Sequence, residues 1–455
     1  MKRRTWLAYP LVPVALLVAY ACGGSNNNNG FDDPTLDGGS SSSSGFVPDG
    51  GEGGKPVGCK GLECQITACG NGAKTTISGT VYAPTPSQFG NPDPIYNAIL
   101  YVPNAELQPF PQTVSCDKCG TITSGSPIAT ALSGADGKFT IENVPDGDDI
   151  PIVIQVGRWR RLVKIPKVEA CKDNKLDKEQ TRLPRNKMEG DIPLMAIATS
   201  PYDPTECILR KIGIDAEEFT TPDQNGRVHI YKGGGATLSG ATPPPASQLW
   251  ASAENLKRYD IVALPCQTDT NQKPTGNGAT NMGAYADEGG RVFITDLSKD
   301  IIQTGVTTWQ KTGTFGGSFT NPGVIDTTFP KGQALADWLA AIGATPTKGQ
   351  INLNAVVTSL SAVTPPSQKW ISGSGAGGIE TYSFNTPVPA DPAAQCGRVV
   401  YSGFHIAQPG GGTFPTECTN TPLTPQEKTL EFLLFDLAAC IQKDDAPPAP
   451  PPVVK

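Results

Sequence analysis

The chain has 455 residues and carries 36 lysines and arginines against 43 aspartates and glutamates, a formal net charge of −7. Because the basic residues are scattered, the sequence lacks the basic face with which nucleic-acid-binding proteins displace counterions, and we expect no nucleic-acid partner. The length is sufficient for two domains with cores of their own.

Residues 1–22 are typical of an export signal. Basic residues precede an apolar run, Trp6 to Tyr20, that is too short for a stable transmembrane span. Residues 17–22 resemble a bacterial lipobox, which implies that Cys22 carries lipid. Ala19–Ala21 also fits an ordinary signal-peptidase site, which would leave Cys22 as a plain thiol. We expect the lipoprotein form, exported and anchored through Cys22 to the outer membrane or cell surface.

Residues 23–74 are predicted to form a disordered tether with a cysteine-rich join at its end. The segment is rich in Asn, Gly, Ser and Asp and is nearly devoid of apolar residues up to Pro56, so it cannot bury enough surface to fold. Residues 443–455 form a Pro-rich tail.

Twelve cysteines in an exported chain indicate disulfides. A zinc ribbon needs two CxxC pairs, whereas only Cys116 and Cys119 form one, so we expect stapled loops, no metal and no cofactor. If Cys22 is lipidated, an odd number remains and at least one thiol is free or intermolecular. The remaining cysteines are Cys59, Cys64, Cys69, Cys116, Cys119, Cys171, Cys207, Cys266, Cys396, Cys418 and Cys440.

Residues 75–170 are predicted to form a small antiparallel β-sandwich. Apolar and polar residues alternate in short runs that are separated by Gly, Pro and Asp turns. Ile77–Tyr82, Ile95–Val102 and Gly134–Pro145 resemble segments of the carboxypeptidase regulatory-like domain. The resemblance implies a transthyretin-like sandwich without catalytic residues, used as a spacer or a binding module.

Arg158, Trp159, Arg160 and Arg161 form the one dense basic stretch of this region. We expect an outward strand face on which Arg stacks on Trp. The alternative is a binding spot for an anionic glycan or a protein partner. Charged and Pro-interrupted residues 171–191 are predicted to be a linker.

Residues 192–442 are predicted to form a three-layer, mostly parallel α/β domain, flavodoxin-like in architecture. Continuous apolar runs typical of buried strands alternate with helical segments, and parallel strands need crossover helices to connect them. Capping boxes at Asp203 and Thr424 predict the starts of two helices, the first ending at Gly213.

Tyr259–Pro265, Tyr285–Ile294 and Gly397–Tyr401, with His405 after the last, resemble the class I glutamine amidotransferase-like fold and its trehalose-utilisation-protein-like branch. In catalytic members of that family a cysteine occupies the turn after the strand matched by residues 291–295. This sequence has Asp296 there, followed by leucine and serine, so the resemblance implies no catalytic triad at that turn.

Cys266, Asp296 and His405 follow predicted strands and are therefore the candidates for chemistry at the carboxyl edge of the sheet. We expect Cys266 to form a disulfide, with a nucleophilic thiol as the alternative. Asp296 and Asp300 could hold a divalent cation, but such residues usually cap helices. His229 is expected to be a core or edge histidine, and Gly233–Gly235 a turn, because no Lys-Ser/Thr follows it.

These observations predict a tethered, disulfide-stapled envelope lipoprotein that acts as a non-catalytic binding or scaffolding module for a protein or glycan. The alternatives are a hydrolase that uses Cys266, Asp296 and His405, and a purely structural spacer. The whole chain is similar to uncharacterised lipoproteins of myxobacteria, a resemblance that supplies no activity.

Overall fold

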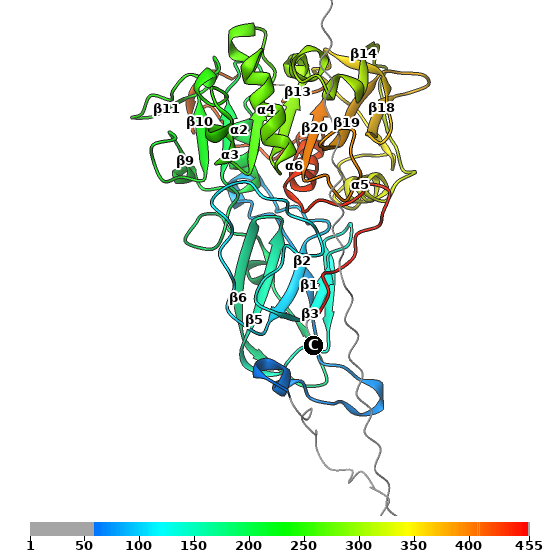
Figure 1. The fold of residues 1–455 in the computed structure, drawn as a ribbon. Helices are drawn as coiled ribbons and strands as arrows, with labels where there is room; N and C mark the ends of the chain where they lie inside the picture. The colour runs from blue at the N-terminus through cyan, green and yellow to red at the C-terminus, as the bar shows by residue number, and fades with distance from the viewer. Residues whose placement is uncertain (1–58, 407, 409, 454–455) are drawn as a thin grey trace, which may run out of the picture. The chain divides into compact units, whose positions relative to one another are not determined.

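The computed structural model describes residues 59–406, 408 and 410–453. The export signal, Cys22 and the tether up to residue 58 therefore lie outside the described residues. Residues 59–74, at the cysteine-rich join, form 3-10 turns and are held by the disulfides Cys59–Cys64 and Cys69–Cys171. The described part combines helices with sheets of parallel and antiparallel strands (Figure 1). None of its helices has both the length and the apolarity needed to cross a bilayer.

Residues 75–191, called the β lobe below, contain two small sheets, as the alternating pattern predicts. Their inward-facing side chains, among them Ile77, Leu100 and Ile152, are fully buried. All strand pairs of the β lobe are antiparallel except β1 with β7. The first sheet has the order β4 (Lys138–Glu142), β1 (Thr76–Thr80), β7 (Asp173–Lys175), and the second β3 (Pro127–Leu132), β2 (Ile99–Pro103), β5 (Gly147–Val156), β6 (Trp159–Val168).

The expected linker, residues 171–191, is folded into the β lobe. It supplies β7 and the short helix α1 (Lys178–Thr181), and Cys171 is bonded to Cys69. The Pro and charge content suggested a boundary, but the capping box at Asp177 and the disulfide hold the segment against the sandwich.

Residues 192–442, called the α/β lobe below, contain a set of parallel strands, as the alternation of apolar runs and helical segments predicts. The strands lie side by side in the order β9 (Phe219–Thr220), β10 (Val228–Tyr231), β8 (Met195–Ala198), β12 (Ile261–Leu264), β13 (Arg291–Thr295), β20 (Gly397–Ser402). Every neighbouring pair among them is parallel.

Helices cover both faces of this parallel set, because its strands are apolar on both sides. One face packs against α2 (Thr205–Ile212) and α6 (Pro425–Ala438), and α5 (Pro330–Ala341) packs against α6. The other packs against α3 (Ala253–Lys257), α4 (Asn277–Asp287) and the π-helical turn Ile301–Gly305. Short 3-10 turns occur at Gly61–Gln65, Gly70–Gly72, Ser87–Phe89, Ala216–Glu218, Ala246–Gln248, Thr270–Gln272, Asp296–Lys299 and Trp309–Lys311.

The prediction of a mostly parallel sheet is only half right, since the sheet continues beyond β20 as antiparallel strands and reaches twelve in all. These strands have mixed or Gly-rich sequences that lack the continuous apolar runs of the parallel half. They are β19 (Ile379–Thr386), β18 (Gln368–Gly373), β15 (Gly323–Ile325) and β16 (Gln350–Ile351), with β14 (Gly313–Gly317) and β17 (Ser359–Val363) beside them. A separate parallel pair joins β11 (Thr237–Leu238) to β21 (Thr413–Phe414).

The two predicted capping boxes have different outcomes. Thr424 caps α6 as predicted, with Glu427 completing the box. The box at Asp203 is wrong, because α2 starts without a side-chain cap and the Asp203 carboxylate is bound elsewhere. Gly213 ends α2 as predicted, with a φ of 127°.

The two lobes are joined covalently and through a common core. Disulfides link Cys116 to Cys396 and Cys119 to Cys440, and one cluster of buried apolar residues runs from the sandwich to α5 and α6. The Pro-rich tail runs back along the β lobe in Figure 1 and is not a free spacer over its described residues. Its Asp444 lies 3.0 Å from the Arg398 guanidinium.

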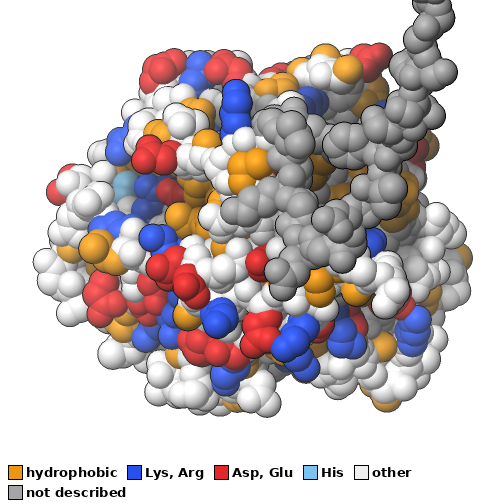
Figure 2. All heavy atoms as spheres, turned by 90° about the horizontal axis from the view of Figure 1, so that it is seen from below, with side chains coloured by type: hydrophobic (Ala, Val, Ile, Leu, Met, Phe, Trp, Pro, Cys, Tyr) orange, Lys and Arg blue, Asp and Glu red, His pale blue; other side chains and the backbone are white. Residues whose placement is uncertain are grey.

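The basic stretch Arg158–Arg161 is not the outward face that the sequence predicts. Arg158 is 6% exposed and pairs with Asp260 at 2.6 Å. The tryptophan is 3% exposed, and Arg160 stacks on the ring of Phe110 at 4.1 Å instead of on that tryptophan. Arg158 and the tryptophan contact the α/β lobe, whereas Arg160 pairs with Asp191 inside the β lobe. The alternative of a binding spot stays a prediction. On the face seen in Figure 2, acidic and basic side chains are interspersed.

Candidate functional site

The carboxyl edge of the parallel strands brings the three weak candidates together. Cys266 follows β12, Asp296 follows β13 directly and His405 follows β20. Because these strands are adjacent and parallel, their ends meet. The Cys266 sulfur, an imidazole nitrogen of His405 and a carboxylate oxygen of Asp296 all lie within 4.8 Å of one another, and all three residues are buried.

The expectation that Cys266 forms a disulfide is wrong. It is buried and unpaired, while the other ten cysteines of the described part pair among themselves. The sequence cannot distinguish Cys266 from the rest, because pairing depends on which loops the fold brings together. The pairs are Cys59–Cys64, Cys69–Cys171, Cys116–Cys396, Cys119–Cys440 and Cys207–Cys418.

Asp296 occupies a strained turn between β13 and the following helical turn. Its φ is 44°, in the left-handed region that non-glycine residues rarely adopt, and its side chain is fully buried. Thr358 Oγ1 donates a hydrogen bond to Asp296 Oδ1 at 2.9 Å. The second oxygen, Oδ2, lies 3.4 Å from His405 Nε2 but has no hydrogen-bond partner of good geometry.

His405 is held by its own loop. Its Nδ1 lies 2.8 Å from the carbonyl oxygen of Ile406, and a carbonyl only accepts, so Nδ1 carries a proton and donates it there. Burial alone would lower the pKa of His405, but the neighbouring side chains of Asp296 and Cys266 outweigh it and raise the pKa to about 11. The imidazole thus faces a carboxylate and a thiol.

A second set of polar groups fixes this arrangement. Asp203, which the sequence placed at a helix start, accepts hydrogen bonds from the Ile406 amide at 3.2 Å and from the Thr295 hydroxyl. The same hydroxyl accepts from the Cys266 amide at 2.8 Å. Burial raises the pKa of the Asp203 carboxyl. Sequence reasoning missed Asp203, because a capping pattern at a helix start explained it locally.

The contacts of His405 differ from those of a nucleophile–base–acid relay. In such a relay the acid holds one ring nitrogen and the nucleophile faces the other. Here Ile406 holds Nδ1, and Asp296 lies on Nε2. The side chains of Cys266, Asp296 and His405 cluster together instead of forming a serial hydrogen-bonded relay. The hydrolase alternative stays a prediction.

Asp300 does not join this cluster as a cation ligand. Its carboxylate pairs with Lys273 Nζ at 2.7 Å. His229 is a buried histidine in β10, 3% exposed, as predicted, and its Nδ1 lies 2.9 Å from the Tyr259 hydroxyl. Gly233–Gly235 forms a turn after β10, also as predicted.

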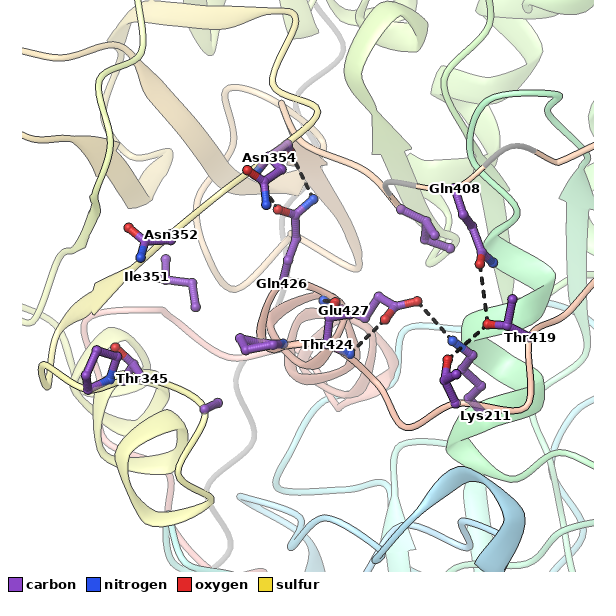
Figure 3. Close-up of a pocket in the computed structure, with 15 residues that line it drawn as sticks. Lys211, Thr345, Ile351, Asn352, Asn354, Gln408, Thr419, Thr424, Gln426 and Glu427 are labelled. Atoms are coloured by element: carbon purple, nitrogen blue, oxygen red, sulfur yellow. Dashed lines mark hydrogen bonds and ion pairs between the residues drawn. The ribbon is translucent and has the colours of Figure 1, made fainter.

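A pocket of about 400 Å³ lies beside the loop that carries His405. Its lining joins the end of α2, the start of α6 and the segment after α5, with Ile406 on one wall. Figure 3 shows Gln426 reaching Asn354 and Glu427 reaching Lys211. The sequence analysis missed this pocket, because its walls come from four distant segments that share no motif.

The pocket carries no net charge, and its surface combines polar groups with a larger share of apolar atoms. The two charged side chains of its lining, Lys211 and Glu427, form a buried pair at 3.2 Å and balance each other. Its other polar side chains are amides and hydroxyls. They belong to Thr345, Asn352, Asn354, Gln408, Thr419, Thr421, Thr424 and Gln426.

No protein-family model matches the sequence, and a comparison with curated proteins finds no relative. Among solved structures, a protein from Thermoplasma acidophilum, provisionally described as a component of GMP synthase, matches at 8% identity with a TM-score of 0.28. It covers 54% of this chain and 94% of its own. A cytoplasmic protein from Salmonella typhimurium matches at 11% identity with a TM-score of 0.27, over 54% and 98% of the two chains.

Both superpositions are too loose to carry an argument about the fold or the activity of this chain. The lipoprotein and carboxypeptidase regulatory-like resemblances stay predictions.

Proposed function

We propose that this protein is a non-catalytic binding protein of the cell envelope and that its ligand is a neutral glycan held in the pocket at the start of α6. The observation that carries the proposal is the lining of that pocket, which has no net charge and combines amide and hydroxyl groups with apolar surface. Its volume falls in the range of about 300 to 1,000 Å³ usual for ligand sites.

The charges of the pocket favour a neutral ligand. Lys211 and Glu427 are 1% and 5% exposed and satisfy each other, so neither offers a free charge to an ionic ligand. Asn352 and Asn354 are exposed at the rim, where their amides can pair with hydroxyl groups, since an amide both donates and accepts. Pro346 and Pro425 are exposed and add apolar surface for the faces of sugar rings.

Export and lipid attachment through Cys22 belong to the same proposal. The disulfides of the described residues support it, because such bonds persist in oxidising compartments. Metabolic labelling with a fatty acid is expected to mark the wild-type protein and to spare Cys22→Ser. Equal labelling of both would rule out this anchor.

Calorimetric titration of the purified protein with cellotetraose and chitotetraose tests the binding proposal. We expect saturable binding of at least one of them with a Kd below about 1 mM, corresponding to about −4 kcal/mol or better. Asn352→Leu should weaken it at least fivefold. Asn277→Ala removes an exposed amide outside the pocket and should leave it unchanged. Absence of saturable binding to both sugars would contradict the proposal.

A further inference from the structure

We propose that Cys266, His405 and Asp296 form a zinc-binding site at the carboxyl edge of the sheet. The inference is independent of the glycan pocket. Thiolate sulfur, imidazole nitrogen and carboxylate oxygen are the three donor types that zinc takes from proteins, and three protein ligands leave a fourth position for water.

The spacing of the three donor atoms suits a single ion. Zinc bonds of about 2.0 to 2.3 Å in a tetrahedron place neighbouring ligand atoms roughly 3.6 Å apart. Asp296 Oδ2 and His405 Nε2 are 3.4 Å apart, and the sulfur lies within 4.8 Å of the donor atoms of both. Small side-chain adjustments are therefore enough to bring all three into bonding distance.

The orphaned oxygen of Asp296 is the second observation. The carboxylate is fully buried, Thr358 satisfies Oδ1, and Oδ2 is left without a hydrogen bond. Buried carboxylate oxygens in native proteins are nearly always hydrogen-bonded. Oδ2 has only His405 Nε2 near it, at 3.4 Å and without a hydrogen bond, so it is free to bind a cation that His405 shares.

The surroundings of His405 fit a metal ligand better than a general base. Ligating histidines almost always donate the other ring N–H to a carbonyl or carboxylate, which fixes the ring and leaves one nitrogen for the metal. Nδ1 of His405 does so to Ile406, and the amide of Ile406 is in turn fixed by Asp203. The backbone of Cys266 is fixed by Thr295. Each of the three residues is therefore held by a hydrogen bond with a neighbouring group, which for Asp296 is the hydroxyl of Thr358.

The position of the site indicates what the ion does. Its ligands come from the ends of β12 and β13 and from the loop after β20, so zinc would link three neighbouring strand ends. Zinc bound there would hold the loop of His405, which also forms one wall of the pocket.

The test uses the full-length chain with its disulfides formed, treated with a chelator and titrated with Zn²⁺ against a chromophoric competitor. We expect one zinc per chain with a submicromolar Kd. Co²⁺ in place of zinc should give cobalt–thiolate absorption. Zinc-edge X-ray absorption should show one sulfur ligand at about 2.3 Å.

Cys266→Ser should abolish the cobalt–thiolate bands, and Asp296→Asn and His405→Gln should each weaken zinc binding at least tenfold. His229→Gln, which alters the other buried histidine, and Cys22→Ser should leave binding unchanged. Wild-type protein that binds no zinc, or cobalt bands that survive in Cys266→Ser, would overturn the proposal. If a variant does not fold, the cobalt absorption and the zinc-edge X-ray spectrum of the wild-type protein still show whether a sulfur ligand binds the metal.

Discussion

The buried carboxylate of Asp203 accepts a hydrogen bond from the backbone amide of Ile406 at 3.2 Å, across 203 positions of sequence. Through this bond the start of α2 holds the loop of His405 against the end of β13. We expect Asp203→Ala to lower the free energy of unfolding by about 1 to 3 kcal/mol, because the buried amide loses its acceptor. Urea denaturation measures the change. A variant as stable as the wild type would mean that the loop does not depend on this contact.

The disulfide between Cys119 and Cys440 joins the β lobe to the end of α6 across 321 residues. Replacing both cysteines by serine should lower the free energy of unfolding by about 2 to 5 kcal/mol, since a long loop in the unfolded chain is released. The matched control is the Cys59–Cys64 pair, which spans five residues and should have a smaller effect. Equal losses in the two double variants would argue against a stabilising link between the lobes.

His229 gives the stability a defined pH dependence. Burial, helped by Arg258 and Arg227, lowers its pKa from 6.5 to about 4. The imidazole therefore takes up a proton more readily in the unfolded chain than in the folded one. Neutral His229 makes its full contribution to the free energy of unfolding above pH 6.5, and this contribution is lost as the pH falls toward 4. The loss amounts to about 3 kcal/mol.

The difference in unfolding free energy between wild type and His229→Gln, followed from pH 8 to pH 4, isolates this effect. The wild type should lose stability relative to the variant over that range. A difference that does not change with pH would show that His229 titrates alike in the folded and unfolded chains.

Gly157 in the turn between β5 and β6 is expected to tolerate no side chain. Its φ is +56°, and a Cβ there would lie 1.8 Å from the carbonyl oxygen of Ala438. Gly157→Ala should therefore cost about 2 kcal/mol or more, from backbone strain and from the clash. Gly72→Ala has a similar φ of +72° in open space and measures the strain alone. Thermal unfolding of the two variants compares them, and equal shifts would mean that the clash contributes nothing.

The parallel half of the large sheet was predictable, because strands such as Ile261–Leu264 are apolar on both faces and leave a continuous signal in the sequence. The antiparallel half was not. Ser359–Val363 mixes small polar and apolar residues, with part of the strand exposed, and resembles a loop until its partners are known. The capping box at Thr424 needs only local contacts and was predicted correctly.

For the site, the sequence predicted that its residues lie at the carboxyl edge of the sheet, but not whether Cys266 is paired or which groups Asp203 binds. Because parallel strand ends meet, Cys266, Asp296 and His405 could be expected near one another. That Cys266 is unpaired follows only from the pairing of the other cysteines, which is a property of the whole fold. Asp203 was assigned to a helix cap, since its real partners are far away in sequence.

The site at the carboxyl edge depends on Cys266 being an unpaired thiol beside His405 and Asp296. The most direct measurement is to unfold the purified protein without reduction, alkylate it, and map the modified cysteines by peptide mass spectrometry. Among the cysteines from Cys59 to Cys440, only Cys266 should carry the label. If Cys266 is instead recovered in a disulfide-linked peptide, this site does not exist in the native protein.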